Sequence, residues 1–119
     1  MNGAAIHVTE CAQLAQAMVG TGFSYEAPRR AEQAKLLVEL LPRVRDIRRP
    51  GAAALDLAYV AAGRLDAFYE RGLKRWDEAA GVLLVQEAGG VVDELAREPA
   101  VRLAAATPEL LEQLRPYAG

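Results

Sequence analysis

One stretch of the sequence, residues 76–90, constrains the fold more than any other. It reads Trp-Asp-Glu-Ala-Ala-Gly-Val-Leu-Leu-Val-Gln-Glu-Ala-Gly-Gly and is followed by Val-Val. This pattern predicts a tightly packed, almost wholly apolar helix that begins near Asp77 and ends at Gly89-Gly90, and then a short strand. Gly81 inside such a helix costs about 1 kcal/mol relative to Ala. A glycine at that cost indicates a packing reason, such as the close approach of another backbone.

Helical and extended patterns alternate along the rest of the chain. Further helices are predicted at residues 29–41, 52–62 and 108–114. Short strands are predicted at residues 6–8, 44–48, 67–69, 91–92 and 101–106, whereas residues 14–19 fit either state. The alternation favours an α/β fold, a layered sheet of mixed or mainly parallel strands flanked by helices. At 119 residues the chain is expected to be a single domain, residues 1–119.

Local signals set the expected boundaries of these elements. Pro42 stops the helix over residues 29–41, and Gly63 is the residue type favoured just past a helix end. Thr107 followed by Pro108 predicts an N-cap and first position for the last helix. Residues 44–48 are expected to form a buried strand despite their charges.

Charge and composition exclude several classes of function. The net charge of −2 gives no electrostatic reason to expect a nucleic acid or an acidic membrane as partner. No apolar run approaches the roughly 18 residues that span a bilayer, and the start of the sequence does not have the form of a signal peptide, so a cytoplasmic location is expected. Cys11 is the only cysteine, so no internal disulfide is expected.

Three segments together resemble the inositol monophosphatase family. Residues 76–90 are similar to the family pattern W-D-x-[AS]-[AG]-[AG]-x-x-[IL]-[VL]-x-E-A-G-G. Residues 48–57 are similar to R-x-x-G-[ST]-A-A-L-[DN], and residues 60–70 to V-A-x-G-x-x-[DA]-[AG]-[YF]-x-E. Asn2-Gly3 with the following residues 6–9 also resembles a stretch near the join of the family's two subdomains. The segments occur in the family's order and with matching spacing over nearly the whole chain.

The resemblance covers only the C-terminal half of the family. The metal-binding motifs of the N-terminal half, G-E-[ED] and D-P-[IL]-D-G-T, do not occur in this sequence. The resemblance therefore implies the C-terminal subdomain of the inositol monophosphatase or sugar phosphatase fold. In this subdomain it implies a strand that ends at residues 19–22. It also implies Mg²⁺ as cofactor, at a site that this chain completes only in part.

Asp77 is the residue that the resemblance assigns to the metal. The matching family residue completes the second metal site and lies beside a substrate hydroxyl. The position of Asp77 at a predicted helix start is compatible with this role. The helix dipole favours an ionised acid there, and Mg²⁺ prefers carboxylate and water oxygens. Capping of the helix is the alternative explanation of its position. Trp76 is expected to pack in the core and orient Asp77, and Lys74 and Arg75 are expected to be solvated.

The remaining candidates are predicted to contact substrate. The family residue matching Glu70 accepts hydrogen bonds from polyol hydroxyls, a task that suits two carboxylate oxygens; a solvated strand end is the alternative. Gly51, Ala52 and Ala53 open a helix whose free N–H groups can bind hydroxyls or anions. Two departures from the family affect the substrate: Ala52 stands where Ser or Thr is usual, and Pro50 replaces an aliphatic residue.

Three functional hypotheses follow from these observations. The first is the C-terminal portion of a Mg²⁺-dependent phosphomonoesterase that hydrolyses an inositol phosphate or a similar small phosphate monoester once an N-terminal half is present. The isolated chain is then predicted to be inactive. The second is an inactive remnant that acts as a binding or self-associating module, and the third is a split enzyme completed by a separate N-terminal chain. A homo-oligomer is expected, because an uncovered subdomain face favours association.

Overall fold

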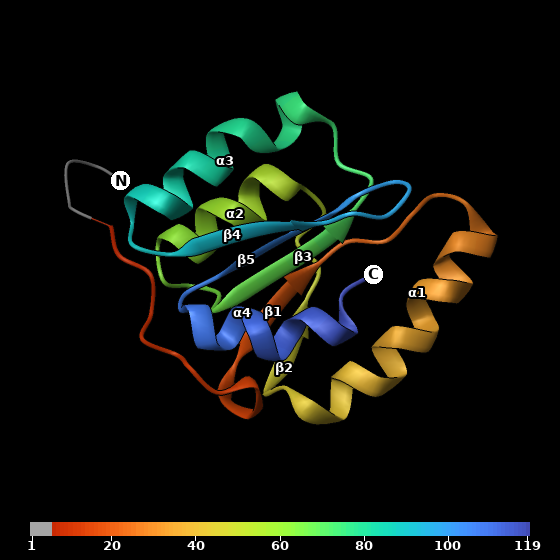
Figure 1. Cartoon of the computed structure of the whole chain (residues 1–119), viewed down its shortest axis with the longest axis horizontal. Helices are drawn as coiled ribbons and strands as arrows, with labels where there is room; N and C mark the ends of the chain where they lie inside the picture. The colour runs from red at the N-terminus through yellow and green to blue at the C-terminus, as the bar shows by residue number, and fades with distance from the viewer. Residues whose placement is uncertain (1–5) are drawn as a thin grey trace.

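A five-stranded mixed sheet organises the computed structural model, which describes residues 6–119 (Figure 1). The strand order is β2-β1-β3-β5-β4. The strands are β1 (Met18–Thr21), β2 (Asp46–Arg48), β3 (Ala67–Arg71), β4 (Val91–Leu95) and β5 (Val101–Ala105). β1 pairs in parallel with both β2 and β3, whereas β5 runs antiparallel to β3 and β4. The predicted α/β architecture with a mixed sheet is therefore confirmed.

Helices cover both faces of this sheet. They are α1 (Ala27–Leu40), α2 (Ala53–Ala61), α3 (Arg75–Glu87) and α4 (Pro108–Leu114), with short 3-10 turns at Leu14–Gln16, Leu41–Arg43 and Arg115–Tyr117. Figure 1 shows α2 and α3 together on one face and α4 on the other. β3 illustrates why two layers form: alternate residues of a strand point to opposite faces. Phe68 packs in the α2–α3 cluster, while Ala67 and Tyr69 pack in the cluster that contains α4.

Boundary signals in the sequence explain where several helices begin and end. The side chain of Thr107 accepts a hydrogen bond from the Leu110 N–H, which confirms the predicted N-cap of α4. Gly63 follows α2 with a φ of 76°, the left-handed conformation that glycine adopts without steric cost. Gly81 lies where α3 crosses α2, and a Cβ there would be 2.6 Å from the Cβ of Leu57. The predicted packing reason for Gly81 is therefore a helix crossing.

Three local predictions need correction, and one that was left open is resolved. Residues 6–8 are not a strand; instead the Val8 N–H donates to the Ala88 carbonyl at 3.1 Å, beside the end of α3. Residues 14–19, which fit either state by pattern, divide between a 3-10 turn and β1, and β1 ends at Thr21 as the resemblance implied. β2 is not buried, because it is a short edge strand with its charged side chains exposed. Trp76 is not a core residue, since it is 79% exposed at the start of α3. Asn2-Gly3 lies outside the described residues.

Candidate functional site

A cavity of about 510 Å³ brings all five predicted site residues together. Gly51, Ala52 and Ala53 line it from the turn that opens α2, Glu70 lines it from the end of β3, and Asp77 from the first turn of α3. Its other lining residues are Tyr25, Ala54, Gly72, Leu73 and Trp76. Three segments that are separate in sequence therefore meet at one cavity. The helix and strand patterns of the sequence do not by themselves predict this arrangement.

The turn that opens α2 presents backbone donors to the cavity. Gly51 has a φ of 95°, so its lack of a side chain lets the chain turn sharply into the helix. Ala52 is the N-cap and has no side-chain oxygen with which to cap the helix. The first N–H groups of a helix have no partner within it, so the Ala53 and Ala54 N–H groups are available to a ligand, whereas the Leu55 N–H donates to the Ala52 carbonyl. Ala52, where the family pattern has Ser or Thr, adds no side-chain hydroxyl to the cavity.

Asp77 is the third residue of α3 and is exposed. Lys74, whose backbone is extended, is the N-cap, so the alternative explanation of Asp77 as the cap is wrong. The position still lies within the first turn, where the helix dipole favours a negative charge. Among residues 6–119, no group of three or more His, Cys, Asp or Glu side chains is placed to hold a metal ion. Asp77 therefore fits a metal as one ligand among others and does not build a site by itself.

Glu70 is half-buried near the end of β3. A Cβ on Gly22 would overlap its carboxylate, so the side chain lies over the backbone that follows β1. Burial raises the pKa of Glu70, Arg49 opposes the rise, and the charge of Asp77 adds to it. The Arg49 guanidinium also lies 5.8 Å from the centre of the Phe23 ring. A carboxylate held in this way can accept hydrogen bonds from hydroxyl groups in the cavity.

Asp56 is the residue that sequence reasoning missed. It is 1% exposed, and neither carboxyl oxygen has a hydrogen-bond partner among the described residues. Burial and the charge of Glu70 raise its pKa to about 7, while Arg49 opposes the rise. Asp66 shows the contrast, because this buried carboxyl accepts hydrogen bonds from the Thr9 hydroxyl and the Met18 N–H. A lone acid within the small-residue helix pattern of residues 52–62 was the available signal.

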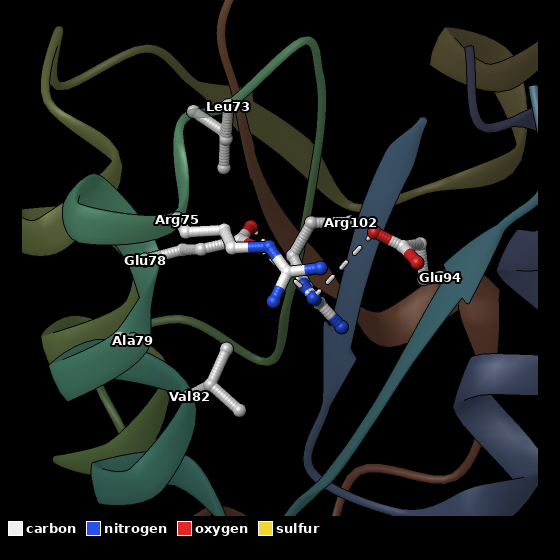
Figure 2. Close-up of a pocket in the computed structure, with 7 residues that line it drawn as sticks. All are labelled: Leu73, Arg75, Glu78, Ala79, Val82, Glu94 and Arg102. Atoms are coloured by element: carbon white, nitrogen blue, oxygen red, sulfur yellow. Dashed lines mark hydrogen bonds and ion pairs between the residues drawn. The ribbon is translucent and has the colours of Figure 1, made fainter. Parts of the chain in front are cut away.

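A second pocket lies between α3 and the β4–β5 edge of the sheet (Figure 2). Its lining residues are Leu73, Arg75, Glu78, Ala79, Val82, Glu94 and Arg102. Arg102 makes two hydrogen bonds to the Glu78 carboxylate, at 3.1 and 3.0 Å, and lies 3.8 Å from Glu94. Two basic and two acidic side chains thus share this pocket, and its ion pair joins α3 to β5. Figure 2 shows Arg75 extending over the pocket toward Arg102.

Replacement of Arg102 by Ala is expected to lower the free energy of unfolding by about 1.5 kcal/mol. The Arg102 and Glu78 side chains are largely buried, at 17% and 11% exposed. Without Arg102, the Glu78 carboxylate would have no charged partner at a place where water solvates it only in part. Urea unfolding measures the loss. The matched control is Arg115→Ala, whose partners Glu112 and Asp93 are more exposed, so that solvent screens these ion pairs and their loss should cost clearly less. Equal losses in the two variants would contradict a structural role of the Arg102 pair.

Comparison with known proteins identifies the family. The family model described as "Inositol monophosphatase family" matches residues 1–118. The chain belongs to the inositol monophosphatase family. This membership confirms what the motifs at residues 48–57, 60–70 and 76–90 indicated.

Individual relatives of this family carry two different names. The "Inositol-1-monophosphatase SuhB" of Mycobacterium tuberculosis (strain ATCC 25618 / H37Rv) is 54% identical over 89 residues, which are 72% of this chain and 31% of that protein. The "Nus factor SuhB" of Xylella fastidiosa is 48% identical over 110 residues, 92% of this chain and 40% of that protein.

Solved structures of the family superpose closely on the fold. Mycobacterium tuberculosis SuhB gives a TM-score of 0.84 at 46% identity, with 94% of this chain and 44% of that chain covered. The extragenic suppressor protein suhB from Bartonella henselae gives 0.86 at 35% identity, with 98% and 47% covered. The chain therefore spans less than half the length of each of these relatives. Within residues 6–119, no helix is both long and apolar enough to cross a membrane.

Proposed function

We propose that this chain supplies the substrate-facing part, and one metal ligand, of a Mg²⁺-dependent phosphomonoesterase of the inositol monophosphatase type. The observation that carries the proposal is the convergence of Gly51, Ala52, Ala53, Glu70 and Asp77 on one cavity. Family membership supports the phosphatase class. The water-activating acids of the family belong to the motifs absent from this sequence, so a second segment or chain must contribute them.

Each cavity residue has a distinct role in this proposal. The backbone N–H groups of the α2 turn bind oxygen atoms of the substrate, and the Glu70 carboxylate accepts hydrogen bonds from its hydroxyl groups. Asp77 holds Mg²⁺ jointly with carboxylates from the other half. When bound, the metal would supply activation of water and stabilisation of the leaving oxygen.

The proposed substrate is an inositol phosphate or another small phosphate monoester rich in hydroxyl groups. The cavity volume of about 510 Å³ is within the range usual for small-molecule sites. A half-buried carboxylate opposite free backbone donors offers acceptors and donors together, which matches a polyol better than an apolar ligand. With Ala at position 52, no hydroxyl at this position distinguishes one polyol from another.

Glu70→Gln tests substrate contact in a protein that joins this chain to the N-terminal portion of the Mycobacterium tuberculosis relative. We expect KM for inositol 1-phosphate to rise about 10-fold with a smaller change in kcat, because a hydrogen bond between a charged group and a hydroxyl contributes about 1.5 kcal/mol. Steady-state phosphate release measures both constants. Glu109→Gln, an exposed acid on α4, is the matched control and should leave them unchanged. An unchanged KM in Glu70→Gln would remove Glu70 from the substrate site.

A binding or self-associating module is the second candidate. Trp76, Leu83 and Leu84 on α3 are exposed, and an apolar helix surface of this kind favours association. Relatives are named both inositol-1-monophosphatase and Nus factor, so their names do not decide between the two candidates. Sedimentation equilibrium tests the self-association: a self-associating module predicts a molar mass that rises with concentration and falls in Leu83→Glu.

A further inference from the structure

Two glycines near the end of β1 make room for two carboxyl groups. A Cβ on Gly20 would lie 2.5 Å from Oδ1 of Asp56 and 2.7 Å from Cδ1 of Leu65, and a Cβ on Gly22 would overlap the Glu70 carboxylate. Alternate residues of an extended strand point to the same face about 6–7 Å apart. Asp56 therefore lies on the same side of β1 as Glu70, beside Gly20, whereas Glu70 lies beside Gly22.

Asp56 belongs to the helical turn that faces the cavity. Its N–H donates to the Ala52 carbonyl at 3.0 Å, and the Leu55 N–H donates to the same oxygen at 3.1 Å. Ala52 and Ala53, which line the cavity, are therefore in one hydrogen-bonded turn with Asp56. The Asp56 carboxyl occupies the space beside Gly20 where this turn faces β1.

We propose that Asp56 is a positioning residue for the substrate-facing turn of α2, which its neutral carboxyl holds against Gly20 of β1 and which moves when that carboxyl ionises. The inference rests on the proposed function in one respect, namely that this turn faces the substrate. An ionised carboxylate that is 1% exposed and has no hydrogen-bond donor among the described residues is poorly stabilised. Movement of the turn toward Arg49 or toward solvent relieves that cost.

The groups around Asp56 set the direction of its response to pH. Glu70 on β3 and Arg49 in the segment before α2 are the charged groups that act on it, and from β1 it faces Gly20, which carries no charge. The raised pKa of Asp56, about 7, places the change of charge near neutral pH. Loss of the Glu70 charge should lower this pKa, and loss of Arg49 should raise it.

The test follows backbone amides of the 119-residue chain by NMR between pH 5 and 9, with His7→Gln in every sample to remove the single imidazole of the chain. The amides of Ala53 and Ala54 are expected to shift with a midpoint near pH 7. Asp56→Asn should abolish the transition. Glu70→Gln should move it to lower pH and Arg49→Gln to higher pH. Asp46→Asn, an exposed acid on β2, is the matched control and should leave it unchanged.

Two results would overturn the proposal: a transition that persists in Asp56→Asn, or amides that do not titrate in the parent chain. Gly20→Ala adds an independent geometric test, because the new Cβ displaces the carboxyl and should shift the same amides at every pH. If Gly20→Ala does not fold, the Asp56→Asn comparison still decides. The NMR experiment requires neither metal nor turnover, so failure of the phosphatase proposal would leave its result intact.

Discussion

Asp77→Asn, in the protein joined to the mycobacterial N-terminal portion, is expected to lower Mg²⁺-dependent phosphate release by about 10²–10³-fold. Asp77 faces the cavity from the first turn of α3, and among the predicted site residues it is the proposed metal ligand. A metal ion contributes several kcal/mol to charge stabilisation in the transition state, and each 1.36 kcal/mol changes the rate tenfold. The amide of Asn keeps the shape of the side chain while removing its negative charge.

The Mg²⁺ dependence of this variant separates a ligand from a structural residue. We expect the Mg²⁺ concentration for half-maximal activity to rise in Asp77→Asn and to stay unchanged in Asp46→Asn, the exposed control on β2. Circular dichroism checks that both variants fold. Full activity of Asp77→Asn at the parent's Mg²⁺ requirement would contradict the metal role.

Asp56→Asn is expected to remove a pH dependence of stability. Between pH 5 and pH 8, the free energy of unfolding of the parent should fall by about 2 kcal/mol relative to that of Asp56→Asn. The pKa of Asp56 rises from 3.8 to about 7 on folding, so the folded state binds this proton more tightly than the unfolded chain. The resulting stabilisation is fully present below about pH 4 and is lost as the pH rises through about 7. The expected change in stability is set below the value that this pKa shift would give in full, because solvent screens part of the carboxylate charge.

Urea unfolding of the 119-residue chain at several pH values measures this effect. Asp56→Asn should gain stability relative to the parent as the pH rises, because it has no proton to lose. Asp46→Asn should not show this gain, because Arg48 lowers the pKa of Asp46 below its ordinary value. Parallel pH profiles for Asp56→Asn and the parent would show that the Asp56 carboxyl stays ionised or finds a partner in the folded chain.

The sequence predicted most of the fold because its strongest signals are local. Thr107 with Pro108 marked α4, and Gly63 marked the end of α2. Trp76 was misplaced because an apolar residue type does not reveal which side of a helix is covered. The burial of β2 was wrong for a similar reason, since strand order decides which strand lies at an edge.

The candidate site was predicted through resemblance, residue by residue, and its three-dimensional arrangement came from the fold. Gly51, Glu70 and Asp77 carried family motifs in the sequence, but their meeting at one cavity depends on how α2, β3 and α3 pack. Asp56 also lay in a motif, yet its importance appears only when its burial and its missing partners are known. Residue type and spacing do not report either property.

Phosphate release from inositol 1-phosphate, by the isolated chain and by the same chain joined to the mycobacterial N-terminal portion, tests the central claim most directly. We expect Mg²⁺-dependent release by the joined protein and none by the isolated chain, because one carboxylate does not build a metal site. Turnover by the isolated chain that disappears in Asp77→Ala would contradict the claim that another half supplies the remaining acids. A joined protein that folds and yet releases no phosphate would contradict the proposed phosphatase function itself.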